Sequence, residues 1–335
     1  MTKEIMKQLL RSTLFITAIG SACPALAIDC GKPSSIVENT ICNSSQLTWL
    51  DSVMSNANRE ALAGKNAAPA LQHIEKWHDS RNACTSINCL RWAYLQGLST
   101  LYQAPENFNW NGTWWNTSAT NGNGGKIVIS KASEWAFDFS GEIWGGVYKS
   151  ALRSNVKKYW GLGFTDRIAW GGDCSVLFIP RPDGKIEINS DNSGSCKLLM
   201  QDYITIDGVY QRSDIDPRPA ATLQSIGVLP TRALDERFRQ LAGKDYLKYV
   251  WAANNVLYSE DQDDIGATVL TLSVKGAASR NAAIIMYTPE GKIWAMLVTP
   301  DAGKENKISI SYITTEEGDK TPPKTLTNWR ALFLD

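Results

Sequence analysis

Apolar residues recur at helical spacing through the first part of the chain. Three runs of this kind lie at 47–62, 69–82 and 89–101. Ser44 or Ser45 can cap the first run, Pro69 suits the first turn of the second, and Pro105 follows the third. The pattern therefore predicts an all-α domain of three helices over residues 28–104.

The period changes to two after Pro105. Short strand-like runs at 126–130, 135–139, 175–179 and 185–188 predict strands, with a turn signal at 182–185 between the last two. Residues 108–212 are therefore expected to form an all-β domain, either a sandwich or a small barrel.

The third part of the chain mixes both periods. A Pro-rich stretch at 213–221 predicts a linker, and helical spacing follows at 231–241 and 245–257. Four strand-like runs come next, at 267–275, 282–288, 293–299 and 308–314, before a short helical stretch at 328–334. Residues 222–335 thus predict an α+β domain.

The N-terminal residues have the composition of a signal peptide. Basic residues precede a short apolar stretch at 12–22, and small residues at positions 25 and 27 favour cleavage after Ala27. Cleavage before Cys23 would give a lipoprotein, but Gly20 stands where such sites usually have Leu. We expect residues 1–27 to be removed and the protein to be periplasmic or secreted. No later run is long enough to predict a transmembrane segment.

The charge balance argues against nucleic acid as a partner. The chain has 34 basic and 34 acidic residues, and removal of residues 1–27 would leave 31 and 33. Neutralising phosphates requires a surplus of positive charge, which this chain lacks.

Six cysteines remain after residue 27, an even number that predicts three disulfides in an exported protein. Cys174 and Cys196 flank the predicted hairpin and are expected to pair. If the first two helices are antiparallel neighbours, Cys42 lies beside Cys84, and Cys30 is left for Cys89. Four cysteines allow three connectivities, so this pairing is one of three alternatives.

We find no residues that predict catalysis, a metal site or a cofactor, and we expect no enzyme. The two histidines, His73 and His78, are five apart and do not share a helix face, and no cysteine is left over as a nucleophile. The acidic run 260–266 resembles a calcium loop, but Ile265 and Leu272 occupy two ligand positions. A polar turn before a strand is the simpler interpretation.

Tryptophan is concentrated in residues 108–212, where most indoles are expected to fill the core. Adjacent side chains of a strand point to opposite faces, so one of Trp114 and Trp115 should lie outside. Trp144 precedes two glycines. Trp114 and Trp144 are therefore the candidate binding residues, as aromatic anchors for a protein or a glycan.

The first domain resembles the LprI family of exported proteins over about 65 of the 335 residues. The resemblance is carried by Cys30, Glu38, Ile41-Cys42, Leu47, Leu50-Asp51, Trp77, Arg81, Cys84, Cys89-Leu90 and Tyr94. One departure is Lys32-Pro33, where an Ala is common soon after the first Cys. The resemblance implies inhibition of lysozyme. We recognise no family for residues 108–335.

These observations favour an exported binding protein that inhibits lysozyme or a related cell-wall hydrolase through a protein–protein contact. One alternative is a glycan- or peptidoglycan-binding module that uses the Trp-rich domain. Another is an immunity protein against a toxin delivered to the periplasm.

Overall fold

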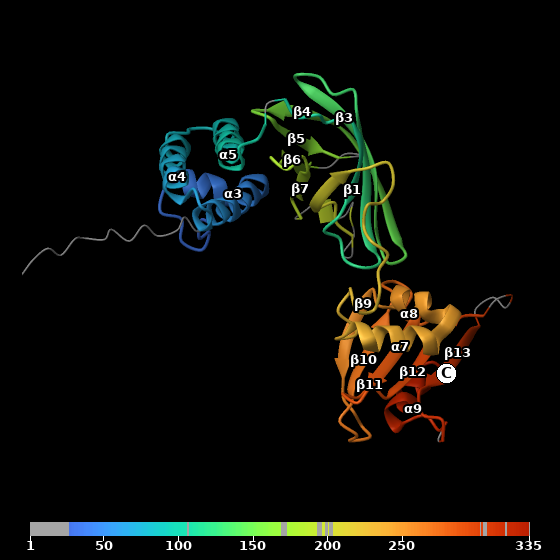
Figure 1. The fold of residues 1–335 in the computed structure, drawn as a ribbon. Coiled ribbons are helices and arrows are strands. Elements are labelled where there is room, and N and C mark those ends of the chain that lie inside the picture. The colour runs from blue at the N-terminus through green and yellow to red at the C-terminus, as the bar shows by residue number, and fades with distance from the viewer. Residues whose placement is uncertain are drawn as a thin grey trace, which may run out of the picture.

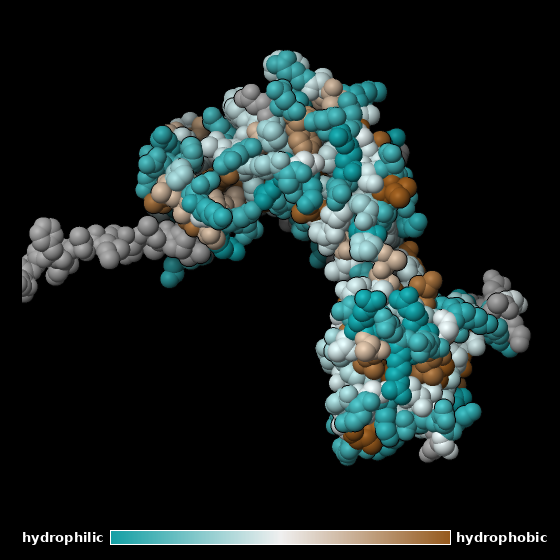
Figure 2. Space-filling model, in the orientation of Figure 1, coloured by the Kyte–Doolittle hydropathy of each residue, from teal (hydrophilic) through white to brown (hydrophobic). Residues whose placement is uncertain are grey.

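The computed structural model describes residues 27–335, apart from 106, 169–172, 193–195, 198–199, 201–203, 302, 304–306, 319 and 335. The expected signal peptide, except for Ala27, and the alternative lipidation site Cys23 lie outside these residues. Three units follow one another along the chain: a helical unit, a barrel and a C-terminal α+β unit (Figure 1). Figure 2 shows the surface of the molecule in the same orientation. None of the described helices is long and apolar enough to cross a membrane.

The helical unit contains α2 (Ile36–Cys42), α3 (Ser45–Ala63), α4 (Ala67–Asn82) and α5 (Ile87–Tyr102). The last three correspond to the predicted helices, and Ser44 caps α3 by accepting a hydrogen bond from the Leu47 N–H. The pattern did not predict α2, because Ile41 is its one buried residue and gives no periodic signal.

The expected pairing of Cys42 with Cys84 and of Cys30 with Cys89 is wrong. The structure joins Cys30 to Cys42 and Cys84 to Cys89, with Cα–Cα distances of 5.4 and 5.5 Å. Helix α2 holds Cys42 next to the segment that precedes it. The α4–α5 turn, where Ser86 caps α5, brings Cys84 and Cys89 together. Both bridges are therefore local.

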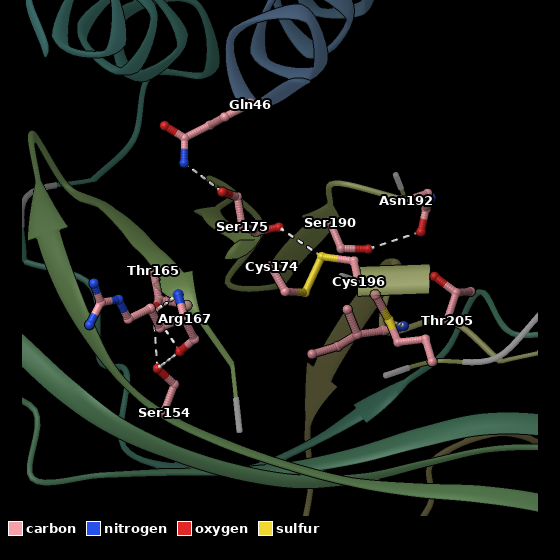
Figure 3. Close-up of a disulfide and its surroundings, with 12 residues drawn as sticks. Gln46, Ser154, Thr165, Arg167, Cys174, Ser175, Ser190, Asn192, Cys196 and Thr205 are labelled. Atoms are coloured by element: carbon pink, nitrogen blue, oxygen red, sulfur yellow. Dashed lines mark hydrogen bonds between the residues drawn. A yellow bond between two sulfur atoms is a disulfide. The ribbon is translucent and has the colours of Figure 1, made fainter. Parts of the chain in front are cut away.

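Eight antiparallel strands close into a barrel in sequence order, and β8 pairs with β1. Of the two architectures expected for residues 108–212, the structure has the barrel. Its strands are β1 (Gly112–Asn116), β2 (Asn123–Ser130), β3 (Ala136–Gly145), β4 (Tyr148–Tyr159), β5 (Leu162–Arg167), β6 (Asp173–Pro180), β7 (Ile186–Ser190) and β8 (Gly208–Arg212). The predicted Cys174–Cys196 disulfide is confirmed (Figure 3).

The helical unit packs against the outside of β5 and β6. Val176 and Phe178 point into the barrel, whereas Leu177 and Ile179 share a core with the helices. This explains why residues 176–179 are continuously apolar, since both faces of β6 are buried. Gln46 of α3 also donates a 2.6 Å hydrogen bond to the Ser175 hydroxyl (Figure 3).

The C-terminal unit is a five-stranded antiparallel sheet in the order β13-β12-β11-β10-β9. Helices α7 and α8 pack on one face of the sheet, and α9 packs on the other. The bounds are α7 (Arg232–Ala242), the short 3-10 helix η1 (Gly243–Asp245), α8 (Tyr246–Ala252), β9 (Asn255–Ser259), β10 (Thr268–Ser273), β11 (Ala282–Tyr287), β12 (Ile293–Pro300), β13 (Ile308–Thr314) and α9 (Lys324–Ala331). The expected helix 245–257 is too long, because the chain turns into β9 instead.

The β3–β4 end of the barrel contacts the C-terminal unit. The Val147 N–H donates to the Lys275 carbonyl, and Asn254 donates through Nδ2 to the Asn121 carbonyl at 2.8 Å. Gly146 has a φ of 62°, and a Cβ there would lie 2.4 Å from the Lys275 carbonyl oxygen. Glycine is thus required at this contact.

Candidate functional site

A buried polar cluster organises the helical unit. Asp51 of α3 accepts two hydrogen bonds of 2.7 Å, from the Tyr94 hydroxyl of α5 and from the main-chain N–H of Ile28. The Arg81 guanidinium of α4 lies 4.0 Å from the same carboxylate and 5.2 Å from the centre of the Trp77 ring. Burial, with the neighbouring negative charge of Asp51, raises the pKa of Tyr94. The cluster joins three helices and fixes the position of Trp77.

A groove of about 200 Å³ lies between α4 and α5, with Trp77 as part of its lining. The buried indole Nε1–H of Trp77 has no hydrogen-bond partner among the described residues. Gly97 permits this arrangement, because a Cβ there would approach the Trp77 ring to 2.5 Å. We call this feature the α4–α5 groove; it is lined by His73, Lys76, Trp77, Ser80, Ala93, Gln96, Gly97 and Thr100.

A second cavity of about 340 Å³ shares His73 and Thr100 with the groove and reaches the barrel at Arg181. Arg181 contacts Glu60 of α3 at 2.6 Å and Glu187 of β7 at 3.2 Å, and its guanidinium lies 4.6 Å from the centre of the Tyr102 ring. These contacts hold the helical unit to the barrel. The helices that form the groove are therefore held against the barrel.

The two histidines have different surroundings. His73 is exposed and lines the groove. His78 is half-buried against Trp77, with ring centres 4.7 Å apart. Burial lowers the pKa of His78, and the nearby charge of Arg81 lowers it further.

The structure places the two predicted binding residues, Trp114 and Trp144, in different environments. Trp114 is 1% exposed, and its indole N–H donates to the Trp110 carbonyl inside the barrel. It is a core residue and not the surface anchor that we expected; its neighbour Trp115 takes the outer face. Trp144 is half-buried over Gly124 and lines a pocket of about 350 Å³ at the end of the barrel, so its binding role stays a prediction.

That pocket also contains the half-buried carboxylate of Asp207. Asp207 accepts hydrogen bonds from Ser190 and Asn192, and burial raises its pKa despite these donors. Because the carboxylate already has partners, its first role is to hold the loops at this end of the barrel.

Sequence reasoning missed two tryptophans of the barrel that the structure exposes. Trp135 is 73% exposed and Trp160 is 45% exposed, and both line one cleft beside α5. The Trp160-Gly161 pair at a hairpin turn was a usable signal, because Trp is unusual at such a position.

No group of three or more histidine, cysteine or acidic side chains gathers as a metal site within the described residues. In the acidic run, Asp261 accepts from the main-chain N–H groups of Ile265 and Ala267, and Asp263 accepts from those at the start of α9. These carboxylates serve a polar turn and a helix cap.

Comparison with known proteins gives one kind of match. The N-terminal region is 35% identical over 79 residues to the lipoprotein LprI of Mycobacterium bovis and of Mycobacterium tuberculosis. The alignment covers 22% of this chain and 40% of the length of these relatives. No protein-family model matches the chain, and no solved structure matches it.

Proposed function

We propose that this protein is an exported, periplasmic or secreted binding protein that inhibits lysozyme or a related cell-wall hydrolase without turnover. The helical unit makes the inhibitory contact through the α4–α5 groove. The observation that carries the proposal is the similarity of the N-terminal region to LprI, the family whose resemblance implies lysozyme inhibition.

The disulfides support both the compartment and the mode of action. Three bridges in 335 residues fit an oxidising, extracytoplasmic environment. A pre-ordered surface also loses little conformational entropy on binding. A rigid inhibitor needs this property and needs no catalytic groups.

The groove offers hydrogen-bond donors to a partner. Lys76 and Gln96 are exposed residues of its lining, and their ammonium and amide groups can donate hydrogen bonds. Glycoside hydrolases carry a pair of carboxylates at their catalytic centre, together with the peptide carbonyls of the surrounding loops. Such acceptors would complement the Lys76 ammonium and the Gln96 amide of the groove.

Lys76 provides the test, because it is exposed and lines the groove. We expect Lys76→Glu to weaken binding to hen egg-white lysozyme about tenfold or more, since a repulsive charge replaces an attractive one. Lys32→Glu makes the same charge change at an exposed position outside the groove and serves as the matched control. Calorimetric titration measures both affinities.

Equal affinities for the two variants would remove the groove from the interface. Absence of binding to lysozymes of several types would overturn the inhibitor proposal itself. Release of soluble product from purified cell wall by this protein alone would show turnover and contradict a purely binding role.

A further inference from the structure

Another concave surface lies where the end of the helical unit meets the barrel. It is a cleft of about 660 Å³ lined by residues of three segments: the end of α5 with the chain that follows it, the approach to β3, and the β4–β5 turn. The cleft is separate from the α4–α5 groove, with which it shares no lining residue.

Two exposed indoles stand on this cleft. Trp135 and Trp160 come from different turns of the barrel, yet both line it. Indoles are costly to leave in water, and most tryptophans of this barrel are buried or half-buried. Two exposed on one concave surface therefore indicate a ligand with flat apolar faces.

Hydrogen bonds anchor the main chain at both tryptophans. The Trp135 carbonyl accepts from the Lys158 N–H at 2.8 Å, which ties it to β4. The Trp160 carbonyl accepts from the Ser99 hydroxyl of α5. The backbone of both tryptophans is therefore held in place, which reduces the backbone entropy lost when a ligand binds.

Trp160 also has an unfavourable backbone conformation. Its φ is 47° and that of Gly161 is 83°, in a two-residue turn between Tyr159 and Leu162. Such a turn requires positive φ at both residues and favours Asn-Gly. A bulky residue kept at this position, with its ring exposed, points to a role outside folding.

The polar lining fits an uncharged ligand. Among the described lining residues the charged side chains are Glu134 and Lys158, one of each sign. Lys158 donates to the Ser133 carbonyl through Nζ at 2.9 Å, which anchors its ammonium. Glu134 and Asn107 are exposed and can bond hydroxyl or amide groups. Because the cleft has no surplus of positive charge, it does not suit a phosphate chain.

We propose that the Trp135–Trp160 cleft binds an uncharged oligosaccharide of hexopyranose rings. The two indoles stack on the apolar faces of sugar rings, and Glu134 and Asn107 bond their polar edges. The claim goes beyond the proposed inhibition and does not depend on it. A protein with both properties would hold an inhibitor of cell-wall hydrolases close to their polymeric substrate.

The test uses the full mature protein with chitotetraose and cellotetraose as probes, titrated by calorimetry. The two probes share the ring geometry and differ in whether the sugar carries an N-acetyl group, so they show whether that group is needed for binding. We expect binding of at least one probe, weakened about tenfold by Trp135→Ala and by Trp160→Asn, because each removes one stacking ring. Trp92→Ala is the matched control, because Trp92 is 56% exposed on α5 and does not line the cleft.

Trp160→Asn also separates function from folding. Asn suits a positive φ, so this variant should melt at the same temperature as the wild type or higher while it loses affinity. The proposal is overturned if neither probe binds at millimolar concentration, or if both cleft variants bind as tightly as Trp92→Ala. Lysozyme inhibition by Trp160→Asn should be unchanged, so failure of one proposal is distinguishable from failure of the other.

Discussion

The main-chain nitrogen of Ile28 lies 2.7 Å from Oδ2 of Asp51, a carboxylate in the interior of the helical unit. Ile28 is the residue that the predicted cleavage after Ala27 would make the N-terminus. Cleavage there would convert this amide into an ammonium group that faces a buried carboxylate. The contact therefore ties Ile28 to the cluster that also holds Tyr94 and Arg81.

Asp51→Asn should lower the free energy of unfolding by about 3 kcal/mol, because it leaves the buried Arg81 without a compensating charge. Urea denaturation of the mature protein measures the change. Asp79→Asn makes the same substitution at an exposed position of α4 and should change stability by less than about 0.5 kcal/mol. Equal stability of the two variants would show that the cluster contributes nothing.

Leu177 tests the shared core between the barrel and the helical unit. It belongs to β6 but packs among the helices, so Leu177→Ala should destabilise by about 3 kcal/mol. Hydrogen exchange should then speed up in α3 and α5 as well as in β6. Val128→Ala, on the outer face of β2, is the control. Unchanged exchange in the helices would mean that the two units fold independently.

Peptide mapping without reductant should find three bridges and no free thiol in the mature protein. The expected pairs are Cys30–Cys42, Cys84–Cys89 and Cys174–Cys196. A Cys42–Cys84 peptide would contradict the structure, and a reactive thiol would contradict the even cysteine count.

Stability should fall steeply in alkali. Burial raises the pKa values of Tyr94, Tyr102, Tyr210 and Tyr249 above the ordinary value of about 10. Above about pH 10 the unfolded chain releases protons that the folded protein keeps, so the free energy of unfolding decreases as pH rises. The lowered pKa of His78 has its effect in acid. Below about pH 6.5 the unfolded chain binds a proton that the folded protein does not, so the free energy of unfolding decreases as pH falls.

Tyr249→Phe tests the predicted loss of stability at alkaline pH. The buried Tyr249 hydroxyl has no partner among the described residues, so its removal costs no hydrogen bond. We expect a shallower loss of stability above about pH 10 and stability equal to or above wild type at neutral pH. An unchanged alkaline slope would show that Tyr249 titrates normally. Urea unfolding at several pH values gives the slope.

The parts of the fold that the sequence predicted are those with an unambiguous period. Helices α3 to α5 and the hairpin with Cys174 and Cys196 are of this kind. Strand β4 was missed because its two buried side chains, Leu152 and Val156, are four apart and equally suit a helix. The continuous apolar run in β6 predicted a strand but not its second neighbour, the helical unit.

The candidate site was likewise predictable only in part. Alternation required one of Trp114 and Trp115 to face outward, but it could not choose between them, because that depends on the barrel register. The disulfide pairing failed because α2 was not predicted. Trp77 and Gly97 come from different helices, and only their packing creates the α4–α5 groove.

The most direct test of the account is a titration of lysozyme activity with the purified mature protein. We predict a saturable decrease in cell-wall hydrolysis with a one-to-one equivalence point, weakened by salt and by Lys76→Glu but not by Lys32→Glu or Trp160→Asn. Full lysozyme activity in the presence of excess protein, across lysozymes of several types, would contradict the account.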